Sequence, residues 1–159
     1  MRNKNILVTF DGSATSLKAV EYVGSQFSGL KDITITLFYV VPNVPPQFWD
    51  DGHILSESEK QDRQAVIDRW FANQTMVMEP HFDRAYNTLT QNYAFDPGQV
   101  KRVMISDVTD VADAIVEEAR DGGYRTVVVG HKGGIGTIAG GLAAAILHKA
   151  SGLAVCVVE

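Results

Sequence analysis

The sequence is poor in cysteine and in basic residues. Cys156 is the single cysteine among 159 residues, so no disulfide can form within the chain. Fourteen Lys and Arg stand against 19 Asp and Glu, which gives a net charge of −5 without a basic cluster for a nucleic-acid backbone or an anionic membrane. A signal-peptide pattern and a run of about 18 apolar residues are also missing. We therefore expect a cytoplasmic protein that binds neither nucleic acid nor membranes.

Motifs of common catalytic and metal sites are missing too. The four histidines show no metal-ligand spacing, and the lone cysteine has no Cys-x-x-Cys partner. No Gly-x-Ser-x-Gly motif occurs, and no Ser, His and acid set stands out. The sequence thus predicts no catalytic residues, and at most slow ATP hydrolysis.

The composition is that of an ordinary globular protein, with 45% hydrophobic and 21% charged residues. A chain of this length is expected to form one domain over residues 1–159. Five short apolar runs predict strands, at 6–10, 33–41, 100–105, 126–130 and 153–158. Helical patterns separate them, and this alternation is typical of a parallel sheet covered on both faces. The predicted fold is a doubly wound α/β sheet of five mainly parallel strands.

An enlarged helical segment is expected at about 49–99. A capping-box pattern formed by Ser56 and Glu59 predicts the start of its first helix. Pro80 is expected to interrupt that helix, because proline lacks a backbone N–H group. A second helical segment is then predicted over 82–93.

A glycine-rich loop is the strongest chemical signal. Six of the 14 glycines fall within 130–141, between a predicted buried strand and a predicted helix. Unpaired N–H groups at a helix N-terminus favour an anion, and glycine lets the backbone approach it closely. Lys132 is the only residue of the loop with a formal charge, and that charge is positive. The pattern predicts a phosphate site, although such loops also form tight connections without a ligand. Neither a Walker motif nor a Gly-x-Gly-x-x-Gly motif after the first strand is present.

Four stretches in order resemble the universal stress protein family. Residues 6–13 resemble its first strand and Asp-Gly-Ser turn, and 38–42 its second strand. Residues 127–133 resemble the opening of its nucleotide loop, and 154–158 its closing strand. The resemblance covers nearly the whole chain outside 49–99, and it implies an adenine nucleotide α-hydrolase-like fold.

The resemblance also implies a nucleotide site. It places Asp11 near the ribose or a magnesium-bridged phosphate, and the backbone of Val40 at the adenine edge. Val129 and Leu142 would line the base or the sugar. Helix capping for Asp11 and core packing for the two apolar residues are the alternatives. The complete predicted set is Thr9, Phe10, Asp11, Val40, Val129, Gly130, Lys132, Gly133, Gly140, Gly141 and Leu142.

The loop departs from the pattern of ATP-binding members, which is Gly-x-x-Gly, nine residues, then Gly followed by Ser or Thr, with another hydroxyl shortly after. Gly130 and Gly133 match the first two glycines, but six residues instead of nine separate Gly133 from the third glycine, Gly140. Gly141 and Ala143 occupy the hydroxyl positions. Two lost hydrogen bonds to phosphate, each worth about 1.5–3 kcal/mol, correspond to a roughly hundredfold or greater loss of affinity. The shorter loop favours a monophosphate or diphosphate over ATP.

Two functions follow from these features. The first is a stress-response or regulatory protein that binds ATP, ADP or AMP, with magnesium. The alternative is a dimeric interaction module of the same family that has lost nucleotide binding. The final strand, Leu153 to Val158, is apolar at nearly every residue, and an uncovered edge of this kind favours aggregation. Pairing of two copies would cover it, and the resemblance implies such a homodimer.

Overall fold

The computed structural model describes residues 4–44, 55–131 and 141–159. One parallel sheet of five strands organises this part of the chain, in the order β3-β2-β1-β4-β5. Its strands are β1 (Ile6–Thr9), β2 (Ile35–Val40), β3 (Val100–Ile105), β4 (Thr126–Gly130) and β5 (Ala154–Val158). The strand order changes direction between β1 and β4. The predicted α/β fold is confirmed, and every described strand pair is parallel.

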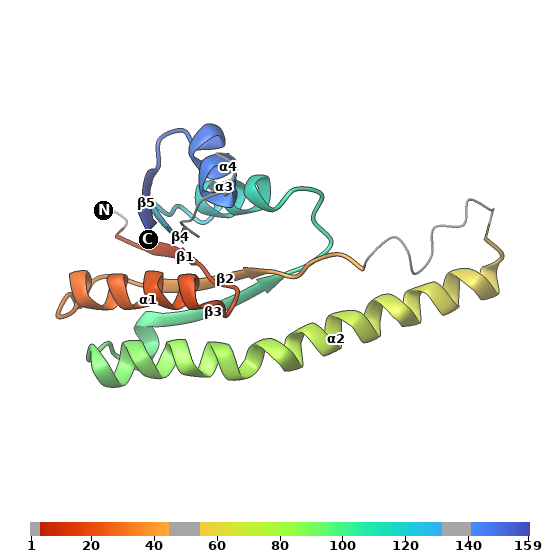
Figure 1. Cartoon of the computed structure of the whole chain (residues 1–159), viewed down its shortest axis with the longest axis horizontal. Coiled ribbons are helices and arrows are strands. Elements are labelled where there is room, and N and C mark those ends of the chain that lie inside the picture. Colours follow the sequence, from red (N-terminus) through yellow and green to blue (C-terminus); the bar gives the residue numbers. More distant parts are fainter. Residues whose placement is uncertain (1–3, 45–54, 132–140) are drawn as a thin grey trace.

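Helices cover both faces of the sheet (Figure 1). One face carries α1 (Ala14–Phe27) and the C-terminal part of α2 (Glu57–Asn87). The other face carries α3 (Val111–Asp121) and α4 (Leu142–Lys149). Each connection from one strand to the next parallel strand thus returns over a face of the sheet.

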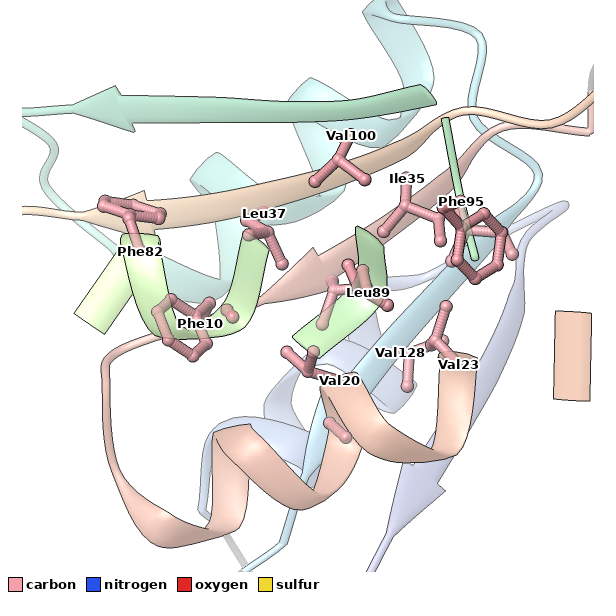
Figure 2. Close-up of a cluster of buried hydrophobic side chains, with 14 of the residues drawn as sticks. Phe10, Val20, Val23, Ile35, Leu37, Phe82, Leu89, Phe95, Val100 and Val128 are labelled. Carbon is pink, nitrogen blue, oxygen red and sulfur yellow. The ribbon is translucent and has the colours of Figure 1, made fainter. Parts of the chain in front are cut away.

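The side chains of β1 alternate between two separate cores. Ile6 and Val8 belong to the core under α1 and α2, whereas Leu7 belongs to the core under α3 and α4. All three are buried, which explains why β1 is an unbroken apolar run. Figure 2 shows the first core, which includes Phe10, Val20, Val23, Ile35, Leu37, Phe82, Leu89, Phe95, Val100 and Val128.

The predicted helix break at Pro80 is wrong. Helix α2 continues through Pro80 as far as Asn87, and a π-helical turn, Thr88–Asn92, follows directly. A proline at this position cannot donate to the carbonyl of Met76, which costs the helix one hydrogen bond. Buried side chains on both sides of the proline offset that loss: Met78, Phe82, Ala85 and Leu89 recur at helical spacing and enter the same core.

The N-terminal part of α2 extends well beyond the sheet (Figure 1). It begins with the predicted capping box, in which Ser56 and Glu59 each bond the other's backbone. Trp70 ties it to the segment after β2, since its Nε1 donates to the Pro42 carbonyl at 2.8 Å. Within the described residues, no helix combines the length and apolar character that a membrane span requires.

Strand β5 lies at one edge of the sheet and pairs with β4. Its core-facing residues Val155 and Cys156 are only partly buried. Ala154 and Val157 are exposed. This apolar strand is therefore an edge strand, which pairing of two copies through it requires.

Candidate functional site

A cavity of about 500 Å³ lies where β1, β2 and β4 end. In open α/β sheets this is where ligands bind, next to the point at which the strand order reverses. The cavity is lined by eight of the eleven predicted residues: Thr9, Phe10, Asp11, Val40, Val129, Gly130, Gly141 and Leu142. The other three, Lys132, Gly133 and Gly140, lie outside the described residues.

The turn after β1 is held by local hydrogen bonds. Asp11 Oδ1 accepts from the Ser13 N–H at 2.9 Å. Ser13 is the N-cap of α1, and its Oγ accepts from the Ser16 N–H at 3.2 Å. Between them, Gly12 has a φ of +79°, and a Cβ there would lie 2.7 Å from Cγ of His81. Asp11 thus shapes this turn and also lines the cavity, but the N-cap of α1 is Ser13 and not, as the capping alternative had expected, Asp11.

Three hydroxyl residues at the N-terminus of α1 also line the cavity: the N-cap Ser13, Thr15 and Ser16. The Ser13 and Ser16 hydroxyls lie 3.3 Å apart, and Ser16 also donates to the Ser13 carbonyl. None of the three belongs to the predicted set of site residues, although the Asp-Gly-Ser turn that ends in Ser13 was recognised in the sequence. The available signal was the run of hydroxyl residues just after the Asp-Gly turn, at the start of a helix that follows a buried strand.

Gly130 is required by packing. A Cβ at this position would lie 2.5 Å from the carbonyl oxygen of Thr15 and 3.2 Å from the Ser16 nitrogen. The end of β4 and the start of α1 therefore touch backbone to backbone. This close approach explains why residue 130 is a glycine, and the explanation requires no ligand. The same contact holds the end of β4 against the start of α1 beside the cavity.

The opposite wall of the cavity is apolar. It is formed from β2, the segment after it, α3 and α4, by Phe38, Val40, Pro42, Val111, Ile115, Leu142 and Ala143. Val111 and Leu142 are exposed, whereas Phe38, Ile115 and Ala143 are buried. An apolar wall that faces a few polar groups is the usual construction of a small-molecule site.

Few charged groups line the cavity. Among the described residues, Asp11 is the one carboxylate and His131 the one imidazole that line it. The pKa of Tyr39 is raised, first by burial and then by the negative charge of Asp11. Within the ranges described, no three His, Cys, Asp or Glu side chains gather into a metal site.

Comparisons with known proteins agree with this architecture. The sequence model of the universal stress protein family matches residues 2–157. A protein of that family from Burkholderia pseudomallei has a TM-score of 0.63 and 19% identity, covering 98% of this chain and 95% of that one. No curated protein sequence matches the chain.

Two of the similar structures contain a bound nucleotide. The universal stress protein from Archaeoglobus fulgidus in complex with dAMP has a TM-score of 0.60 and 13% identity, with 100% of both chains covered. A family protein from Arabidopsis thaliana with AMP bound has a TM-score of 0.54 and 16% identity, covering 98% of this chain and 90% of that one. At identities this low, the similarity of these structures to the chain establishes a shared fold.

Proposed function

We propose that this chain, which belongs to the universal stress protein family, binds an adenine nucleotide in the cavity at the ends of β1, β2 and β4. The observation that carries the proposal is the convergence of eight predicted residues from separate elements on one cavity. Nucleotide occupancy, rather than a reaction, would regulate the protein through its dimer or a partner surface.

The two walls of the cavity match the two ends of a nucleotide. The flat face of the adenine ring fits the apolar wall that contains Val40, Val111 and Ile115. The sugar and phosphate fit the part of the cavity at Gly130 and Gly141, where β4 ends and α4 begins. The nucleotides in the Archaeoglobus fulgidus and Arabidopsis thaliana structures are dAMP and AMP, which belong to the same chemical class.

A monophosphate or diphosphate suits this site better than ATP. Gly141 and Ala143 line the cavity at the positions where ATP-binding members would carry hydroxyls, and neither has a polar side chain. Magnesium would reach the site on the phosphates, since it usually keeps several waters and takes one or two protein carboxylates. Asp11 is the cavity carboxylate that suits this role.

Gly141 offers a paired test of the site. It is the N-cap of α4, its φ of −61° suits any residue, and a Cβ there would meet no atom of the described residues within 4 Å. Gly141→Ser adds the missing hydroxyl and is expected to tighten AMP binding by about tenfold, the equivalent of one hydrogen bond to a charged group. Gly141→Asp adds a negative charge and is expected to weaken AMP binding at least tenfold.

Both Gly141 variants are expected to stay folded, because Ser and Asp are favourable N-cap residues. Calorimetric titration of AMP into each variant measures the affinities, and thermal unfolding checks the fold. Equal AMP affinity in the serine and aspartate variants would contradict the proposed position of the phosphate.

The dimer is a second proposal, and the exposed edge of β5 favours it. Val157 is 38% exposed on this edge strand, and pairing with a second copy would cover it. Sedimentation at micromolar concentration should give twice the 17.4 kDa of the chain, and Val157→Glu should shift the protein toward the monomer by charge repulsion across the interface. A wild-type chain that sediments only at 17.4 kDa would refute the dimer.

A further inference from the structure

One side of α2 carries exposed apolar residues. Val66 is 42% exposed and Val77 is 59% exposed, and Met76 beside Val77 is exposed as well. The residues that α2 contributes to the core, such as Met78 and Phe82, lie on another side of the helix. The N-terminal part of α2 extends beyond the sheet, so the sheet does not cover it (Figure 1). A partner that covered these side chains would gain from their burial.

Four exposed residues form one row along this side of α2, which we call the outer row: Glu59, Val66, Val77 and Arg84. Successive members are 7, 11 and 7 residues apart. These spacings are close to two, three and two full helical turns, so the four residues lie on one face of the helix. The row is symmetric about the midpoint between positions 71 and 72. An antiparallel second copy centred there places Glu59 opposite Arg84 and Val66 opposite Val77, each pair occurring twice.

We infer that the outer row is a docking surface for α2 of a second copy of this chain, paired antiparallel. Charge complementarity favours a second copy as the occupant, because the acidic end of the row meets the basic end of the other row. A parallel pair would instead set Glu59 against Glu59 and Arg84 against Arg84, which is unfavourable. Glu59 Oε2 accepts from the Ser56 N–H at 2.7 Å, and a carboxylate that caps a helix can still pair with an arginine.

The surface around Arg84 is shaped to receive the end of the second helix. A shallow hollow of about 520 Å³ lies on α2 and the π-helical turn, and its lining includes Pro80, Arg84, Asn87, Thr88 and Gln91. The antiparallel register sets residues 80–87 opposite residues 56–63 of the second copy, which form the polar start of its α2. The amide and hydroxyl groups of the hollow can form hydrogen bonds with these polar residues. The hollow therefore lies where the first two turns of the second helix would dock.

The expected association is weak. Two valine pairs and two exposed ion pairs make a small interface, and interfaces below about 1,200 Å² are typical of transient complexes. We therefore expect pairing through α2 at about 100 µM and above. The outer row is separate from the β5 edge and from the cavity, so this pairing requires neither the β5 dimer nor a nucleotide.

Sedimentation of the full chain carrying Val157→Glu tests the surface while pairing through β5 is disfavoured. The mass should rise from 17.4 kDa toward twice that value as the concentration increases from about 10 to about 500 µM. Adding Val77→Asp, at an exposed residue where folding is not at risk, should hold the mass at 17.4 kDa. Ala72→Asp is the matched control, because Ala72 is exposed on α2 but lies outside the outer row, and it should associate like the parent.

Two outcomes of the sedimentation experiment would overturn the inference. One is a Val157→Glu chain that stays at 17.4 kDa over the whole concentration range, which would leave the outer row to a different protein or to none. The other is equal association of the Val77→Asp and Ala72→Asp variants.

Cysteine cross-linking tests the antiparallel register. Val66→Cys and Val77→Cys are made as separate variants of a Cys156→Ser chain, which has no other thiol. Mild oxidation of a mixture should give a covalent dimer on a non-reducing gel, because position 66 of one copy lies opposite position 77 of the other. Each variant alone should give none, since 11 residues of helix set the two like cysteines about 16 Å apart, beyond the reach of a disulfide. A mixture without covalent dimer, or equal dimer in the single variants, would contradict the register. Neither experiment contains a nucleotide, so failure here leaves the proposed function standing.

Discussion

Replacing Phe82 with alanine is expected to lower the free energy of unfolding by about 3–5 kcal/mol, the usual cost of a large aromatic deletion in a core. The Phe82 side chain is 1% exposed. Its ring lies 5.5 Å from that of Phe10, centroid to centroid, at an angle of 44°. Figure 2 shows the two rings meeting at the end of the first core. The contact joins α2 to the residue that precedes Asp11, so its loss should also loosen the turn beside the cavity.

Phe71→Ala is the matched control for Phe82→Ala. Phe71 lies on the same helix but is 37% exposed, outside both cores. Its removal should cost less than about 1 kcal/mol, since a partly exposed side chain loses little burial. Urea unfolding followed by circular dichroism measures both free energies. Equal losses in the two variants would show that α2 is not anchored through Phe82.

Gly130→Ala is expected to have the second largest effect, a loss of about 3 kcal/mol. The new Cβ would lie 2.5 Å from the Thr15 oxygen and 2.8 Å from the Thr15 carbonyl carbon. Both are backbone atoms, so neither can rotate away as a flexible side chain could. The strand β4 and the helix α1 must separate, and the hydroxyls of α1 move with the helix. AMP affinity should therefore fall together with stability.

Gly98→Ala separates this steric cause from a general effect of losing a glycine. A Cβ at Gly98 would meet no atom of the described part of the chain within 4 Å, and the φ of Gly98 is not positive. Its melting temperature should stay within about 2 °C of the wild type, whereas Gly130→Ala should melt about 10 °C lower. A stable Gly130→Ala protein that binds AMP normally would contradict the packing explanation for this glycine.

Much of the fold could be predicted because its signals are local. The buried strands are nearly continuous apolar runs, as the three valines of 127–129 illustrate, and parallel strands buried on both faces require this pattern. The turns after β1 and β4 follow such strands directly. Parallel strands end at the same edge of the sheet, which is why residues such as Asp11 and Gly130 could be assigned to one site from the sequence.

What the sequence did not reveal depends on contacts between distant segments. Helix α2 continues through Pro80 because Met78 and Phe82 are both buried in one core. The rule that proline interrupts a helix does not include the free energy gained by burying these side chains. The packing role of Gly130 depends on Thr15, which is far away in the sequence. His131 belongs to no metal-ligand or catalytic pattern in the sequence, yet the fold places it on the cavity.

The central claim is that an adenine nucleotide binds at the ends of β1, β2 and β4. Amide chemical-shift mapping by NMR during titration with AMP tests it most directly, because the method reports both binding and its location. We predict saturable shifts at Asp11, Val40, Gly130 and Gly141, and none over residues 57–77 of α2. The absence of shifts at millimolar AMP, or shifts confined to a face away from the cavity, would contradict the account.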